Sequence, residues 1–186
     1  VVFNTPGANA NAVKELAVCA LLLASRKISD GVAWVKEQAA AGADVEQAVE
    51  KGKSQFVGPE LMGKTLGVIG AGHIGKEVIR VARALDMEVL AYSRTPKDDG
   101  VCYVGLDELL SRSDFVSLHC PLSDQTRHLI NADTLAKMKP PACLINASRG
   151  ALVDEPALIA ALQNGVIAGA GLDVQETEPP AADNPL

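Results

Sequence analysis

A glycine-rich hexapeptide, Gly70-Ala71-Gly72-His73-Ile74-Gly75, is the segment whose residue types and spacing most directly suggest chemistry. It follows the apolar run 66–69 and opens a helical pattern at about residue 73. In this setting the first glycine permits a tight turn, the second lets the backbone approach a pyrophosphate, and the third lets helix and strand pack closely. The free N–H groups of the first helical turn favour phosphate. We therefore predict a dinucleotide site with contacts from Gly70, Gly72, His73, Ile74 and Gly75; the alternative is a glycine-rich turn kept for packing.

The residues that follow the second predicted strand bear on the type of dinucleotide. An acidic residue usually stands there and binds the ribose 2′-hydroxyl of NAD. This sequence has Ser93, followed by Arg94 and Thr95. The position therefore lacks a carboxylate that would repel a 2′-phosphate, and a guanidinium with two hydroxyls could bind that phosphate. The sequence therefore favours NADP over NAD, with the alternative that Arg94 stacks on adenine or lies in solvent while NAD binds.

From residue 65 onward, short apolar runs alternate with helical patterns. Runs such as 66–69 and 143–145 lack polar alternation, which is typical of strands covered on both faces. Strand and helix repeated in this way predict a parallel sheet with right-handed crossovers, so the expected fold class is α/β with a Rossmann-type doubly wound parallel sheet. The expected strands are 65–70, 88–92, 101–104, 115–120, 142–147 and 167–174, and the expected helices are 74–85, 107–111, 132–137 and 155–163.

A long helical segment precedes this core. Residues 10–27 predict a helix whose broad apolar surface suggests burial on two sides, with one face formed by Val13, Leu16, Ala17, Ala20, Leu21 and Ala24. A second, more polar helical stretch at 32–51 is interrupted at Gly42 and is expected on the surface. We therefore divide an NAD(P)-binding domain of residues 1–186 into a leading helical segment, 1–62, and a Rossmann core, 63–186.

The composition excludes several classes of protein. The 186 residues include 17 Lys and Arg against 23 Asp and Glu, a formal net charge of −6, and 48% are hydrophobic. The apolar content rules out disorder, and the acidity speaks against nucleic acid as a partner. No run is long enough to cross a bilayer and no signal peptide is recognisable, so no membrane partner is expected. Four scattered cysteines predict core thiols in a cytoplasmic protein and no metal site: Cys19, Cys102, Cys120 and Cys143.

Further motifs are spread along nearly the whole chain: 4–9, 63–70, 119–122 followed by Thr126, 146–150, and 171–174 followed by Glu178-Pro179-Pro180. In this order they resemble the D-isomer-specific 2-hydroxyacid dehydrogenases. The first motif is most similar to phosphoglycerate dehydrogenases, whereas residues 93–95 are more similar to glyoxylate and hydroxypyruvate reductases. The resemblance implies hydride transfer between a nicotinamide cofactor and a small D-2-hydroxy or 2-oxo acid of the phosphoglycerate, hydroxypyruvate or glyoxylate type.

The resemblance also implies roles for single residues. Arg149 would bind the carboxylate and carbonyl of a 2-oxo acid and polarise that carbonyl, although an arginine capping a strand end is the alternative. Glu178 would orient the catalytic histidine and raise its pKa; from the residues alone, a solvated charge is the preferred interpretation. Asp173 resembles the residue that holds the nicotinamide carboxamide. The same motifs predict further cofactor contacts from Cys120, Pro121, Thr126, Ala147 and Ser148.

The histidine of that family has no counterpart here. His73, His119 and His128 lack its Pro-His context, and we interpret the last two as local hydrogen-bonding residues. The resemblance therefore implies that the catalytic histidine and the substrate domain lie outside this chain. We expect a domain of something longer, which binds cofactor but shows little turnover alone.

The same resemblance bears on assembly. In relatives the helix at 10–27 packs across a dimer, so a homodimer is expected. Two other functions stay open. One is a cofactor-responsive, non-catalytic dimerising or corepressor-like module, against which Arg149 and Glu178 count. The other is a Rossmann module kept as an oligomerisation scaffold.

Overall fold

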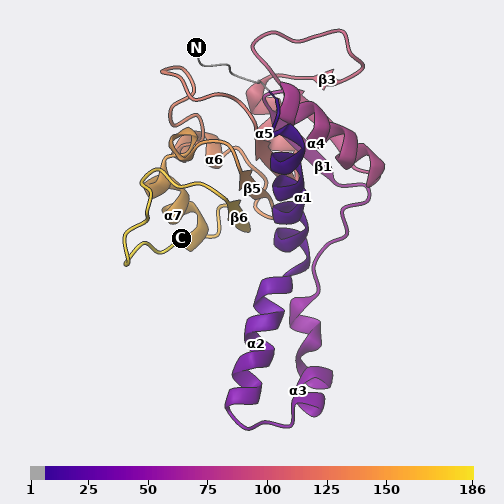
Figure 1. Ribbon diagram of the computed structural model, residues 1–186, viewed down its shortest axis with the longest axis vertical. Helices are drawn as coiled ribbons and strands as arrows, with labels where there is room; N and C mark the ends of the chain where they lie inside the picture. The colour runs from indigo at the N-terminus through magenta and orange to yellow at the C-terminus, as the bar shows by residue number, and fades with distance from the viewer. Residues whose placement is uncertain (1–6) are drawn as a thin grey trace.

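The computed structural model describes residues 7–186, so residues 4–6 of the first motif lie outside the described part of the chain. A six-stranded, fully parallel sheet with the order β3-β2-β1-β4-β5-β6 forms its centre (Figure 1). The strands are β1 Thr65–Ile69, β2 Glu88–Tyr92, β3 Cys102–Tyr103, β4 Phe115–Leu118, β5 Cys143–Asn146 and β6 Gly169–Leu172. The first strand, β1, therefore lies in the middle of the sheet, and the later strands add to it on both sides. This confirms the Rossmann-type, doubly wound α/β fold.

Helices cover both faces of the sheet. The helices that pack on it are α1 Ala10–Arg26, α4 His73–Ala84, α5 Leu106–Arg112, α6 Ala132–Leu135 and α7 Glu155–Gln163, and a 3₁₀ turn, η2, spans Gly150–Leu152. One cluster of buried side chains joins α1 and α4 to Leu66 and Val68 of β1, and another joins α5, α6 and α7 to Ile69. Successive strand residues point to opposite faces, so a sheet covered on both faces needs apolar runs without alternation.

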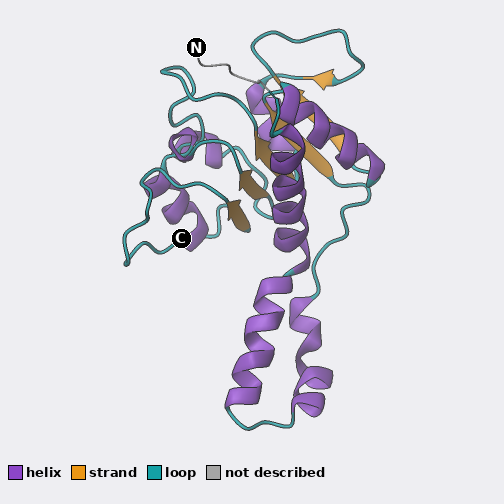
Figure 2. Cartoon of the chain, in the orientation of Figure 1, coloured by secondary structure: helices purple, strands orange, loops and turns teal. Residues whose placement is uncertain are grey.

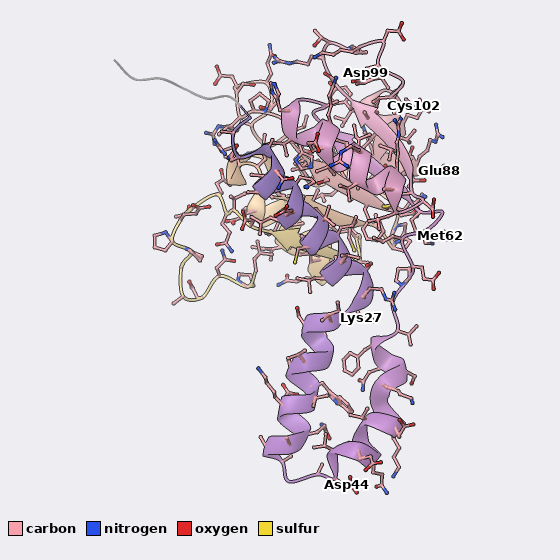
Figure 3. All side chains as sticks on the ribbon, turned by 45° about the vertical axis from the view of Figure 1, so that its right-hand side comes forward. Lys27, Asp44, Met62, Glu88, Asp99 and Cys102 are labelled. Carbon is pink, nitrogen blue, oxygen red and sulfur yellow. The ribbon has the colours of Figure 1, made fainter. Side chains whose placement is uncertain are left out.

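A helical hairpin, residues 28–56, projects away from this α/β body (Figure 2). It consists of α2 Ile28–Ala40, α3 Val45–Gly52 and the 3₁₀ turn η1 Lys53–Phe56. Figure 3 shows Lys27 at its base and Asp44 at its tip. Lys27 adopts a left-handed conformation, φ 48°, which ends α1 and redirects the chain into α2. The interruption expected near Gly42 is present, because Gly42, φ 72°, lies in the turn between α2 and α3.

Little is buried inside the hairpin. The rings of Trp34 and Phe56 lie with centroids 5.3 Å apart, but neither α2 nor α3 contains a buried residue. The surface position expected for this stretch is therefore confirmed. No helix within residues 7–186 is long and apolar enough to span a bilayer.

The buried face of α1 differs from the expected one. It comprises Ala10, Lys14, Ala17, Leu21 and Ser25, whereas Leu16 is 49% exposed. The helix packs against α4, β5 and β6, and a Cβ on Gly171 of β6 would lie 3.1 Å from the Ala20 Cβ. This close contact covers one side of α1 and leaves the other side open, so burial on two sides does not occur among residues 7–186. The expectation of core thiols is also wrong for Cys19 and Cys102, which are exposed.

Candidate coenzyme-binding site

The glycine-rich segment forms the turn between β1 and α4. Gly70 has φ 100°, and its N–H donates to the Tyr92 carbonyl at 2.9 Å. A Cβ on Gly70 would lie 2.6 Å from the Cys120 backbone nitrogen, and one on Gly75 would collide with the Gly70 carbonyl oxygen. A Cβ on Gly72, by contrast, would meet nothing within 4 Å. The first and third glycines are therefore required by the protein itself, whereas the second faces open space.

The first turn of α4 is left available for a ligand. The helix begins at His73, and no side chain caps its N-terminus. The first N–H groups of an α-helix have no partner within the helix, and they carry the positive end of its dipole. Ile74 and Gly75 belong to this same turn. The arrangement can hold an anion against backbone amides.

An open hollow of about 380 Å³ lies beside this turn, at the carboxyl ends of β1, β2 and β4. Predicted site residues on its wall are Gly70, Gly72, Ser93, Arg94, Thr95, Cys120, Pro121 and Thr126. Residues on the wall that were not predicted to contact the cofactor include Ala71, Tyr92, Lys97, His119, Gln125 and Leu129. Tyr92 could have been predicted as a residue of this hollow, because it ends a predicted strand at this edge of the sheet. Nothing in the local sequence around Gln125 indicates its position.

The loop that follows β4 is held in shape by one hydroxyl group. The Thr126 Oγ1 accepts from the Ser123 N–H at 2.8 Å and donates to the Pro121 carbonyl at 2.7 Å. The Thr126 side chain thus ties the loop to its own beginning. Pro121 and Cys120 are thereby kept against the hollow. Burial raises the pKa of the Cys120 thiol, although the nearby Arg94 charge acts in the opposite direction.

His119 is a buried histidine on the wall of the hollow. The residue is only 9% exposed, and its Nε2 lies 2.8 Å from the Ser117 Oγ, which confirms the expected local hydrogen bond. Burial lowers the pKa of His119 to about 4, because the charged imidazolium loses its hydration there. Its Nδ1 is buried and has no hydrogen-bond partner among the described residues. A buried polar atom without a partner is costly in a folded protein unless a ligand or water satisfies it.

Ala147 and Asp173 lie on a different surface from the glycine turn. They border a second hollow, about 740 Å³, between α1 and strands β5 and β6. Ser148 connects the two regions, since its Oγ donates to the Cys120 carbonyl at 3.1 Å. The Asp173 N–H donates to the Asn146 carbonyl at 2.9 Å. The predicted residues therefore follow the carboxyl edge of the sheet from β2 to β6.

Arg149 and Glu178 stand on neighbouring loops. A Cβ on Gly150 would collide with the Gln175 carbonyl oxygen, so the loops 147–150 and 173–178 are packed together. Both side chains are exposed: the Arg149 Nη1 donates to the Ser148 carbonyl at 2.7 Å, and the Glu178 Oε1 accepts from the Gln175 N–H at 3.0 Å. Among residues 7–186, no histidine forms a hydrogen bond with Glu178.

The histidine that does contact this acidic loop is His128. Its Nε2 lies 2.8 Å from the Glu176 Oε1, and the Arg127 Nη1 lies 3.6 Å from the same oxygen. His128 and Glu176 are 48 residues apart, so the expectation of a local hydrogen bond is wrong for His128. The pair fastens the 173–178 loop to the loop after β4. It therefore anchors the segment that carries Glu178.

The donors and open space at this edge fit a dinucleotide. The unpartnered His119 Nδ1, the uncapped turn of α4 and the free space above Gly72 all belong to one continuous region. Pyrophosphate would be held by amide groups, and the flanking hydroxyl and guanidinium groups would hold the ribose end. No group of three or more His, Cys, Asp or Glu side chains among residues 7–186 is arranged to hold a metal ion.

Fold and site together define a dinucleotide-binding α/β protein. Residues 18–186 match the model of the D-isomer specific 2-hydroxyacid dehydrogenase family, NAD binding domain. The chain therefore belongs to this family and contains its nicotinamide-cofactor-binding domain.

Known proteins of this family are similar along most of the chain. A hydroxypyruvate reductase of Thermotoga maritima is 44% identical over 96% of this chain and 56% of its own length. A D-3-phosphoglycerate dehydrogenase of Synechocystis is 43% identical over 96% of this chain and 31% of its own length. The crystal structure of a glyoxylate reductase from Paecilomyes thermophila superposes with a TM-score of 0.81 at 40% identity, covering 97% of this chain and 53% of that one. The chain thus spans about half, or less, of these relatives.

Proposed function

We propose that this chain is the cofactor-binding part of an oxidoreductase that transfers a hydride between a nicotinamide cofactor and a small D-2-hydroxy or 2-oxo acid. The observation that carries the proposal is the uncapped helix turn at Gly72, beside a hollow bordered by hydroxyl and guanidinium groups. Relatives named hydroxypyruvate reductase, glyoxylate reductase and D-3-phosphoglycerate dehydrogenase support substrates of these three types. The bound cofactor would supply or accept the hydride.

In this proposal Arg149 binds the substrate carboxylate and carbonyl. Its guanidinium offers paired donors and a permanent charge, which stabilises the negative charge that develops on the carbonyl oxygen. Glu178 orients a histidine that donates the proton to that oxygen, and Asp173 holds the carboxamide of the nicotinamide. The packing of Gly150 against Gln175 supports this arrangement, because it brings the Arg149 and Glu178 loops together.

The remaining parts of the proposal concern chain organisation. We assign residues 63–186 to the Rossmann core and 1–62 to a leading helical segment, and we place the substrate domain and the histidine outside this chain. The larger size of the relatives supports this placement. The chain alone should then bind cofactor with little turnover, and saturable dehydrogenase activity from residues 1–186 would contradict this. We also propose a cytoplasmic location, which the four scattered cysteines without a Cys-x-x-Cys pair support.

We further propose that NADP is preferred over NAD. Ser93, Arg94 and Thr95 border the hollow where β2 ends, and none of them is acidic. Calorimetric titration of the chain and of Arg94→Ala with NADPH and NADH tests this. A loss of affinity restricted to NADPH would support a 2′-phosphate contact, whereas equal losses for both cofactors would refute it.

We also propose a homodimer formed through α1 and the helical hairpin. Large exposed apolar side chains lie on these elements and just after the hairpin: Leu16, Leu22, Leu23, Ile28, Val32 and Val57. The hairpin also carries an apolar hollow of about 500 Å³ next to Trp34 and Phe56. Such a surface is unusual on a monomer.

Val32→Asp tests the dimer by sedimentation velocity. It should raise the dimer dissociation constant roughly tenfold or more, because a charge would be buried at the interface. Leu122→Asp changes an exposed apolar residue outside this surface and should have no effect. A wild-type chain that is monomeric at all concentrations, or equal effects of the two variants, would refute the dimer.

A further inference from the structure

One hydrogen bond crosses the hollow beside the glycine turn. The Arg94 Nη1 donates to the Gln125 Oε1 at 2.8 Å. Arg94 follows β2, whereas Gln125 belongs to the loop after β4, 31 residues further along the chain. Both residues border the hollow. The bond therefore connects two walls of the candidate site at the place where β2 ends.

The partner of Arg94 differs from the partners of three other exposed arginines, which pair with carboxylates. Arg80, Arg112 and Arg127 each lie beside a glutamate carboxylate at 2.6–3.6 Å. Gln125 is a neutral amide, so it fixes the position of the Arg94 guanidinium without cancelling its charge. A guanidinium has five N–H donors, and this bond uses one of them. The remaining donors and the full positive charge stay available to an anion.

The loop that carries Gln125 is itself fixed. Thr126, the next residue, ties the loop to Pro121 and Ser123 through its hydroxyl group. Gln125 therefore stands on a constrained backbone, and Arg94 is held by it above the hollow. An arginine that is already placed loses less side-chain entropy when it binds a ligand.

We propose that Gln125 is a positioning residue that holds Arg94 ready for the 2′-phosphate of NADP, and that its neutral amide contributes to cofactor choice. This inference rests on the proposed binding of NADP at Ser93, Arg94 and Thr95. A carboxylate at position 125 would pair with Arg94 and repel the 2′-phosphate. An aliphatic residue there would leave the charge of Arg94 intact but free its side chain.

Binding of NADPH and NADH to the chain, measured by calorimetry, tests the inference. Gln125→Glu should weaken NADPH binding roughly tenfold and leave NADH within about twofold, because it places a negative charge near the phosphate. Gln125→Ala should weaken NADPH roughly threefold through loss of one hydrogen bond. Gln47→Glu is the matched control, since the Gln47 amide also accepts from a cation, Lys51 at 3.1 Å, but lies on the hairpin. It should change neither affinity.

A double-mutant cycle separates the inference from the proposal on which it rests. In an Arg94→Ala background, Gln125→Ala should cause no further loss of NADPH affinity, because Gln125 acts through Arg94. If Arg94→Ala weakens NADPH alone while the Gln125 variants match Gln47→Glu, the role of Gln125 is wrong and the NADP site stands. Equal effects of Gln125→Glu on both cofactors would likewise overturn the role of Gln125. If Arg94→Ala affects both cofactors equally, the NADP proposal itself fails.

Discussion

The α/β body and the helical hairpin belong to one chain but cover their apolar side chains differently. In the body, strands β1, β4 and β5 are almost wholly buried between two layers of helices. In the hairpin, no residue of α2 or α3 is buried, and Ile28 and Val32 are each 50% exposed. The body therefore has the core that makes a domain stable, whereas the hairpin has a surface suited to contact with another molecule. Stability and association should thus be separable by mutation.

The largest difference in stability between the body and the hairpin is expected when one isoleucine in each is replaced. Ile145 in β5 is 1% exposed and Ile28 in α2 is 50% exposed. Ile145→Ala should lower the free energy of unfolding by about 4 kcal/mol, since it removes buried methyl groups and leaves a cavity. Ile28→Ala should change it by less than about 0.5 kcal/mol, because little burial is lost and alanine favours helix.

Urea unfolding at low protein concentration measures both. Low concentration keeps association from contributing to the apparent stability of the hairpin variant. Similar losses for the two variants would show that the hairpin is as much a part of the folding core as the sheet. This result would contradict the distinction between body and hairpin.

Acid sensitivity should come from the body through His119. Its pKa is lowered by burial from 6.5 to about 4, so the unfolded chain binds a proton there between these pH values and the folded chain does not. Stability is therefore retained above pH 6.5 and falls as the pH drops towards 4, by roughly 3 kcal/mol in total. His119→Gln should remove this slope.

Asp114 does not add to the loss of stability expected from His119 as the pH falls from 6.5 to 4.5. Burial alone would raise its pKa, but the Thr65 N–H and the Lys139 ammonium outweigh that effect and hold the pKa below its ordinary value of 3.8. Its contribution to stability is therefore lost only at lower pH. Thermal unfolding from pH 7 to pH 4.5 is the measurement. An unchanged slope in His119→Gln would show that another group carries the acid sensitivity.

The smallest difference in global stability between the body and the hairpin is expected when the N-terminal cap of one helix in each is removed. The side chain of Asp154 accepts from the Ala157 N–H at 3.1 Å at the start of α7, and that of Asp44 accepts from the Gln47 N–H at 3.2 Å at the start of α3. Asp154→Ala should lower the free energy of global unfolding by about 1 kcal/mol. Asp44→Ala should instead increase amide exchange in α3 with no change in global unfolding, because α3 lies outside the core. Equal global losses would contradict the separation.

Much of the fold could be predicted from local patterns, because strands buried on both faces and a glycine turn leave strong signals. The region from Thr65 to Gly75 combines an apolar run, the turn glycines and the helix start within a few residues. The buried side of α1 could not be predicted. Apolar residues surround much of that helix, and the choice of face depends on its close contact with Gly171, far along the chain.

The candidate site was predictable where it follows motifs and not where it depends on loop contacts. Local sequence indicates Arg94 but not its partner Gln125, which comes from another loop. The same holds for the His128–Glu176 pair, whose members stand 48 residues apart. Such contacts depend on how the loops meet above the sheet, and no periodicity or spacing within either segment encodes that meeting.

Binding of NADPH and NADH to Gly72→Val tests the central claim most directly, with Gly105→Val as the matched control. Neither glycine has a positive φ, and a Cβ on either would meet nothing within 4 Å, so both variants should fold. If a pyrophosphate rests against the turn at Gly72, the Gly72→Val side chain should weaken both cofactors roughly tenfold to a hundredfold, and Gly105→Val should leave them unchanged. Unaltered affinity in a folded Gly72→Val protein would contradict the account.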